Sequence, residues 1–149
     1  MNFNLSEEQN MLKDSIARFV RDEYDFDSRR ANAASDLGFN VANWQLFAEL
    51  GWPSLPFDEA HGGFGGGATE VMAVMEEMGK GLVVEPFVAT VLMFGGLLNK
   101  SGNADLQNAN IEKIIDGSLQ GAFGYLERQS RFELADVKTQ AKRGGDEFI

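Results

Sequence analysis

The stretch that decides the fold is PFDEAHGGFGGGATEVMAVMEEMGKGL, from Pro56 to Leu82, in which a glycine-dense loop runs into an amphipathic segment. Glycine adopts backbone conformations closed to other residues and loses more entropy on ordering, so a run this dense requires a compensating contact. The residues that follow repeat at the spacing of one helical face: Val71, Met72, Val74, Met75 and Met78. We therefore expect a loop and then a helix with Thr69 as its N-cap, ending at Gly79 or Gly81.

The glycine loop allows two interpretations. Free amides at a helix N-terminus can bind a phosphate, and Gly63 to Ala68 fits a relaxed G-x-G-x-x-A pattern. The dinucleotide-binding fingerprint, however, follows a strand, whereas Pro53 and Pro56 precede this loop. Gly79-Lys80 is followed by glycine and lacks the spacing of a P-loop. A tight structural turn is therefore the favoured interpretation, and phosphate binding is the alternative.

Composition excludes several classes of function. The chain has 149 residues, enough to bury a core, and its 23 acidic against 13 basic residues give a net charge of -10. This balance argues against nucleic acid and against anionic membrane surfaces as partners. The absence of cysteine excludes disulfides and thiolate sites and is typical of a reducing compartment, so we expect a cytoplasmic protein. The N-terminus lacks a signal-peptide pattern, and the most apolar run, from Phe87 to Leu98, is too short to span a bilayer.

Few residues suggest metal or acid/base chemistry. His61 is the only histidine, which leaves one candidate for a catalytic triad or a multi-histidine site. Asp58, Glu59 and His61 crowd into four residues of a loop, an arrangement untypical of a metal site, so no metal is expected. Adjacent carboxylates such as Glu76 and Glu77 do not face each other on a helix, which indicates a solvated face rather than an acid/base pair.

Capping signals predict helices before the glycine loop. The first starts after Ser6, an N-cap with Gln9 in the capping-box position, and ends near Tyr24. The segment from Asp27 to Phe39 is interpreted as a helix end plus a connection. The next helix runs from Val41 to Leu50, with Asn40 as its cap and Gly51 as its stop.

Two helices are expected after the glycine loop. One opens with Pro86 as its first helical residue and continues to Leu98 with almost no polar face, so it should be central. Its Gly95-Gly96 pair costs about 1 kcal/mol per glycine relative to alanine, which favours close helix packing. The alternative is the wall of an apolar pocket that leaves room for a chain-like ligand. The last helix covers Ala104 to Asp116 and ends at Gly117.

The hydrophobic period then changes to that of strands. Gln120 to Glu127 and Ala135 to Lys142 are predicted strands, followed by a turn at Gly144-Gly145-Asp146. Phe148-Ile149 would begin a return strand. A hairpin cut at this point exposes apolar residues, so we expect the chain to be a fragment or one half of something larger.

Several of these strings resemble the acyl-CoA dehydrogenases: SEEQNMLKDSIARFV, WQLFAELGWPSLPFDEAHGGFGGG, EVMAVMEEMGKGL and GAFGYLE. Within that family the chain looks most similar to the small subunits of pimeloyl-CoA-dehydrogenase-like heteromers. The resemblance implies a mainly α fold, with the N-terminal helical bundle domain over residues 1–117. It implies that residues 118–149 begin the middle β domain, truncated here, and that a C-terminal helical bundle lies outside the chain.

The resemblance also implies an activity, the FAD-dependent α,β-dehydrogenation of an acyl-CoA thioester. The family's catalytic glutamate lies in the C-terminal bundle, so this chain has no catalytic residue and is expected to be inactive alone. FAD would belong to the complete enzyme. Expected partners are the acyl-CoA substrate and the rest of the enzyme or a second subunit, in a homo-oligomer or hetero-oligomer. The alternative is a free-standing helical module that binds acyl-CoA or a partner protein without catalysis.

Site residues follow from the same resemblance. Phe123, Tyr125 and Leu126 occupy the family's first flavin-contacting strand, in which Leu126 replaces a threonine. Phe132 stands where the family has a serine near the CoA arm, and only the nearby Ser130 can replace that hydroxyl. The acyl-chain pocket is assigned to four residues of one helix: Phe87, Thr90, Val91 and Phe94.

Overall fold

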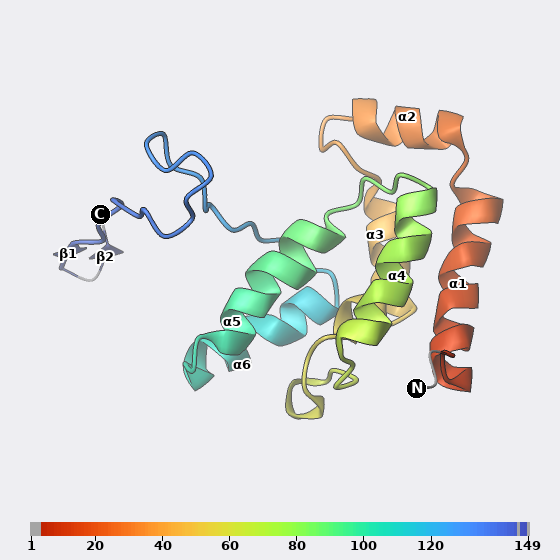
Figure 1. Ribbon diagram of the computed structural model, residues 1–149, viewed down its shortest axis with the longest axis horizontal. Coiled ribbons are helices and arrows are strands. Elements are labelled where there is room, and N and C mark those ends of the chain that lie inside the picture. The colour runs from red at the N-terminus through yellow and green to blue at the C-terminus, as the bar shows by residue number, and fades with distance from the viewer. Residues whose placement is uncertain (1–3, 146, 149) are drawn as a thin grey trace.

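The computed structural model describes residues 4–145 and 147–148, and most of its ordered elements are helices. In chain order these are α1 (Glu7–Glu23), α2 (Phe26–Ala34), α3 (Val41–Glu49), η1 (Trp52–Ser54), η2 (Glu59–His61), α4 (Ala68–Lys80), η3 (Phe87–Gly95), α5 (Gly96–Lys100) and α6 (Ala104–Ile115). A short hairpin of β1 (Arg143–Gly144) and β2 (Glu147–Phe148) follows. The helices form one bundle, and the chain after α6 leaves it as an extended arm, residues 118–145 (Figure 1).

The expected first helix is confirmed in detail. The Ser6 hydroxyl accepts a hydrogen bond from the Gln9 amide at 3.1 Å, and the Gln9 side chain accepts one from the Ser6 amide at 2.8 Å. The side-chain nitrogen of Gln9 also donates to the Glu70 carboxylate at 2.6 Å. The start of α1 is thereby tied to the start of α4, which lies beside it (Figure 1).

Two expected boundaries are wrong. Residues 27–39 are not a helix end plus a connection, because Asp25 accepts from the Ser28 amide at 2.7 Å and caps a separate helix, α2. Thr69 is not the N-cap of α4, which begins at Ala68 after Gly67. The Glu70 carboxylate accepts from the Gly67 amide at 2.7 Å, so the N-cap is Gly67, two residues before the expected Thr69.

The glycine loop is a tight structural turn, as favoured from the sequence. Gly65 donates to the Phe57 carbonyl at 2.7 Å, and Gly66 donates to the Leu55 carbonyl at 2.8 Å. A Cβ atom at Gly63 would lie 2.0 Å from the Phe57 carbonyl oxygen, so only glycine fits there. Because these amides already have partners in the chain, they are not available to cradle a phosphate.

The core lies between α1, α3, α4, η3 and α6, where aromatic side chains interlock. The Phe19 and Phe47 ring centroids are 5.1 Å apart with planes at 87°, and Phe47 and Trp52 lie 4.7 Å apart. The Phe19–Phe47 pair is edge-to-face, an arrangement that adds stability beyond the area it buries, and the Phe47–Trp52 pair is tilted. The apolar core residues are Ile16, Phe19, Tyr24, Trp44, Phe47, Trp52, Leu55, Phe57, Val74, Met78, Phe87, Val91, Leu98, Ile111 and Ile114.

The apolar helix after the glycine loop differs from expectation at its start and along its length. Pro86 has φ -77° and ψ 42°, outside the helical region, so it caps the helix instead of opening it. The first nine residues, η3, form a wider π-helix, and α5 continues it. The close packing favoured for the Gly95-Gly96 pair is found at Gly95 only: a Cβ there would lie 2.5 Å from the ring of Phe57, a loop residue, whereas a Cβ at Gly96 would meet no atom within 4 Å. The helix is not enclosed on all sides, because Val88 and Leu97 remain 44% and 50% exposed.

The two strands predicted over 120–127 and 135–142 are absent: the structure has extended chain and turns there. An alternating pattern gives a strand only where a partner supplies backbone hydrogen bonds, and within the described residues these segments have no such neighbour. The only ladder in the described residues pairs Arg143 with Phe148 and Gly144 with Glu147. This agrees with the expected turn and with Phe148 in a return strand, while Asp146 and Ile149 lie outside the described residues.

Candidate functional site

The junction between η3 and the arm joins two residues assigned to the acyl pocket to Gly121, which precedes the segment assigned to the flavin. Thr90 is fully buried, and its hydroxyl donates to the Gly121 carbonyl at 3.2 Å and accepts from the Gly121 amide at 3.4 Å. The Phe94 ring lies so close to Gly121 that a Cβ there would be 2.1 Å from it. Glycine is therefore required at position 121, and the start of the arm is fixed to the helix assigned to the acyl pocket.

Beyond this junction the arm presents its aromatic residues to solvent. Phe123 and Tyr125 are 43% and 41% exposed, with ring centroids 5.8 Å apart. Leu126 is 67% exposed and has no polar side-chain atom. No hydrogen bond within the described residues uses the backbone amides of residues 123–126. These amides and two aromatic faces are therefore available to a ligand or partner.

An apolar groove of about 300 Å³ separates Phe123 from the bundle. Its other walls come from η3 and α5: Leu92, Met93, Gly96, Leu97 and Lys100. Phe87 and Val91, also assigned to the acyl pocket, do not reach this groove, and both are buried in the core. The structure therefore brings Thr90 and Phe94 to the arm but places Phe87 and Val91 elsewhere on the same helix.

A carboxylate closes the next part of the arm into a loop. The Glu127 side chain accepts from the amides of Lys138 at 2.9 Å and Thr139 at 3.0 Å, and also from the Gln129 side chain. The hydrogen bonds from Thr139, Gln129 and Lys138, in that order, lower the pKa of Glu127 to about 2. Glu127 therefore stays ionised over the physiological range and holds the two ends of the loop together.

Ser130, the candidate for a hydroxyl near the CoA arm, lies inside this loop. It is only 5% exposed, and its hydroxyl donates to the Glu127 carbonyl at 3.0 Å and accepts from the Glu127 amide at 3.3 Å. Phe132 is 99% exposed at the tip. The buried hydroxyl serves the turn itself, and the group that the loop presents outward is an aromatic ring.

Sequence reasoning missed a buried polar network at the start of η3. The Tyr24 hydroxyl donates to Glu85 at 2.8 Å and accepts from the Val84 amide at 3.0 Å, and Asn43 donates to the other Glu85 oxygen at 3.0 Å. Burial is the main cause that raises the pKa of Tyr24 above its usual value. The only sequence signal was Glu before Pro86, because the partners lie 61 and 42 residues away.

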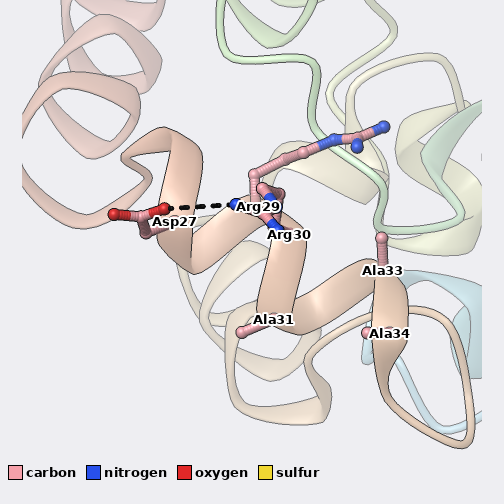
Figure 2. A pocket seen from close by; sticks show the side chains of 6 residues that line it. All are labelled: Asp27, Arg29, Arg30, Ala31, Ala33 and Ala34. Carbon is pink, nitrogen blue, oxygen red and sulfur yellow. Dashed lines mark ion pairs between the residues drawn. The ribbon is translucent and has the colours of Figure 1, made fainter.

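The outer face of α2 carries a shallow pocket of about 540 Å³ without convergent polar groups (Figure 2). Its ion pair, between Arg30 and Asp27, spans 3.9 Å on the surface. Three alanines form much of the remaining wall. Among the described residues no cluster of histidine and carboxylate side chains is arranged to hold a metal ion, and no helix is long and apolar enough to cross a bilayer.

Comparison with known proteins gives a consistent picture. Residues 6–118 match the family described as acyl-CoA dehydrogenase, N-terminal domain. A probable acyl-CoA dehydrogenase of Bacillus subtilis, YngJ, is 26% identical over 151 residues, covering all of this chain and 39% of that protein. The acyl-CoA dehydrogenase IpdE2 of Mycolicibacterium smegmatis is 34% identical over 118 residues, covering 78% of this chain and 36% of that protein. The chain thus spans less than two fifths of the length of these relatives.

Solved structures show the same fold. The acyl-CoA dehydrogenase from Geobacillus kaustophilus superposes with a TM-score of 0.81 at 20% identity, covering all of this chain and 39% of that one. An acyl-CoA dehydrogenase from Bacillus anthracis complexed with FAD gives 0.80 at 18% identity, covering 93% and 24%. The ChsE4-ChsE5 complex from Mycobacterium tuberculosis gives 0.73 at 23% identity, covering 80% and 33%.

Proposed function

Because the chain belongs to the acyl-CoA dehydrogenase family and corresponds to its N-terminal domain, we propose that it supplies this part of an FAD-dependent enzyme that dehydrogenates an acyl-CoA thioester. The observation that carries the proposal is the junction of Thr90 and Phe94 with Gly121. It joins the helix assigned to the acyl pocket to the segment assigned to the flavin. The substrate and the flavin would then meet where η3 meets the arm.

The arm fits part of a flavin site. Phe123 and Tyr125 offer exposed rings, and the amides of residues 123–126 lack described partners, so this segment can contact the edge of a flavin ring. Leu126 offers no side-chain hydrogen bond, and Ser130 is occupied within its own turn. When bound in a complete enzyme, FAD would supply the hydride acceptor. This chain contributes backbone and aromatic contacts at one edge only, so we infer that it does not retain FAD alone.

The substrate contacts proposed for this chain are apolar. Phe94 lies at the junction, and Phe87, Thr90 and Val91 set the position of η3 from within the core. No carboxylate lines the groove beside Phe123, so the base that removes the α-proton must come from outside these residues. We infer that the isolated chain is inactive and depends on the rest of the enzyme or on a second subunit.

Between a homo-oligomer and a hetero-oligomer, the comparisons support the hetero-oligomer, since one structural relative is described as a complex of two proteins. The exposed side chains of Leu97, Phe123, Tyr125 and Leu126 would contact that partner. The cysteine-free composition supports placing the assembly in the cytoplasm.

The test is to purify the 149-residue chain and measure visible flavin absorption and acyl-CoA-dependent dye reduction. We expect the chain alone to be colourless and inactive. Flavin absorption and dye reduction should both appear when the missing part or the partner subunit is supplied. Stoichiometric flavin with turnover in the chain alone would contradict the inferred dependence. If activity never appears but acyl-CoA binds without flavin, the chain is the non-catalytic binding module, an alternative favoured by its self-contained helical core.

A further inference from the structure

A second groove, of about 500 Å³, has no residue of the arm in its lining. Its apolar walls come from the end of α4, the linker after it and the start of η3, including Met75, Met78, Val83, Phe87 and Val88. This volume is in the range of small-molecule sites. Phe87 and Met78 form a buried floor, whereas Val88 is 44% exposed on the rim.

Leu82 stands on the rim of this groove in an unusual backbone conformation. Its φ of 52° lies in the left-handed region, which costs a non-glycine residue about 1 kcal/mol or more. The amide of Leu82 donates to Gly79 at 3.1 Å and the next amide donates to Met78 at 3.0 Å, which holds the turn in place. The result is a leucine side chain that is 57% exposed above the groove.

One cation reaches into the groove from α2. The Arg29 side chain leaves α2 away from the Asp27–Arg30 pair (Figure 2), and its Nε atom donates to the Leu82 carbonyl at 3.4 Å. No ion pair within the described part of the chain includes Arg29. Its two terminal nitrogens are therefore free to bind an anion, and a guanidinium suits a carboxylate in particular.

The carboxylate that lines the groove, Glu85, does not form an ion pair with Arg29. Glu85 lines the groove, but its two oxygens accept from Tyr24 and Asn43 in the core, and it is 5% exposed. An apolar channel with an unpaired guanidinium at its rim is complementary to a molecule with an alkyl chain and one negative end group.

We propose that this groove binds a free medium-chain alkyl carboxylate, with the chain on Met75, Met78 and Phe87 and the carboxylate at Arg29. This site is separate from the arm and needs neither flavin nor acyl-CoA. It goes beyond the proposed dehydrogenase function, so either can fail without the other.

The test is isothermal titration of the whole 149-residue chain with octanoate, using Arg29→Gln and the matched control Arg30→Gln. Both variants remove one positive charge from the same helix, but only Arg29 lines the groove beside Leu82. We expect one saturable site, weakened about fivefold or more by Arg29→Gln and unchanged by Arg30→Gln. 1-Octanol has the same chain without the charge, so its affinity should be equal for the wild type and Arg29→Gln.

A further variant tests the apolar wall. Val88→Asp places a charge on the half-exposed rim, which the fold should tolerate, and it should remove binding of both octanoate and 1-octanol. Thermal melting would confirm that each variant is folded. Absence of octanoate binding to the wild type would overturn the proposal, as would equal losses in the two arginine variants.

Discussion

The neighbouring glycines of the apolar helix provide a direct test of the packing. Gly95 and Gly96 both have right-handed helical dihedral angles, so alanine at either position gains about 1 kcal/mol of helix propensity. A Cβ atom at Gly96 would meet no atom within 4 Å. At Gly95 it would lie 2.5 Å from Cζ of Phe57 and 3.2 Å from the Thr90 carbonyl oxygen.

The two substitutions should therefore differ in their effect on the free energy of unfolding. Phe57 is 1% exposed, so its ring has little room to move, and overpacking of this kind costs about 1–3 kcal/mol. Gly96→Ala should raise the free energy of unfolding by about 1 kcal/mol, whereas Gly95→Ala should leave it unchanged or lower it by up to about 2 kcal/mol. Urea denaturation, followed by the fluorescence of the buried Trp44 and Trp52, measures both.

Because the helix-propensity gain is common to both variants, their difference reports the close contacts at Gly95, of which the Phe57 ring is the nearest. We expect Gly96→Ala to be the more stable by about 1–3 kcal/mol. Equal midpoints with equal denaturant slopes would show that the ring yields without cost, and the account of Gly95 as a close-packing position would be wrong.

Three further outcomes follow from the polar contacts. The lowered pKa of Glu127 means that its loop contacts are fully present above about pH 4.5 and are lost as the pH falls toward 2. The protection of the Lys138 and Thr139 amides from hydrogen exchange, relative to the unfolded chain, should fall over the same range. Glu127→Gln should remove this pH dependence of the protection. Tyr24→Phe leaves a Glu85 oxygen without its donor and should lower the free energy of unfolding by about 1–3 kcal/mol in urea titrations. Thr90→Val removes both bonds to Gly121 and should speed proteolytic cleavage of the arm while the bundle stays intact.

Tyr125→Phe is the control for the tyrosine variant, because Tyr125 is exposed on the arm and no hydrogen bond within the described residues involves its hydroxyl; stability should not change. For Thr90→Val, Thr69→Val is the comparison, since it alters an exposed threonine of α4 and leaves both the arm and its junction with η3 in place. An arm that is cleaved equally fast in the wild type and in Thr90→Val would contradict the anchoring role of the junction.

Local signals in the sequence were enough to predict most helices. Ser6 with Gln9, and Asn40 before Val41, are caps whose partners lie within three residues, so the pattern and the structure agree. Helix α2 was missed because none of its residues is buried and its hydrophobic pattern is weak. The start of η3 was displaced by one residue because Pro86 has a non-helical ψ angle, which the residue type alone does not reveal.

The site depended more on long-range contacts than the helices did. The resemblance pointed to Thr90 and to the segment around Phe123, but only the structure shows that Thr90 bonds to a residue 31 positions later. The strands predicted on either side of the arm's loop were wrong because strand pairing is a property of two segments, and alternation is visible in one. The role of Glu127 in closing the loop was not predicted, since its amide partners lie 11 and 12 residues away.

The arm also sets the hydrodynamic size of the molecule. A fully compact chain of 149 residues would have a radius of gyration of about 15 Å. Here the bundle is compact, but the arm projects well beyond its surface (Figure 1). The mass is thus distributed along an axis, and the molecule should tumble more slowly and scatter as a longer object than its mass of 16.4 kDa suggests.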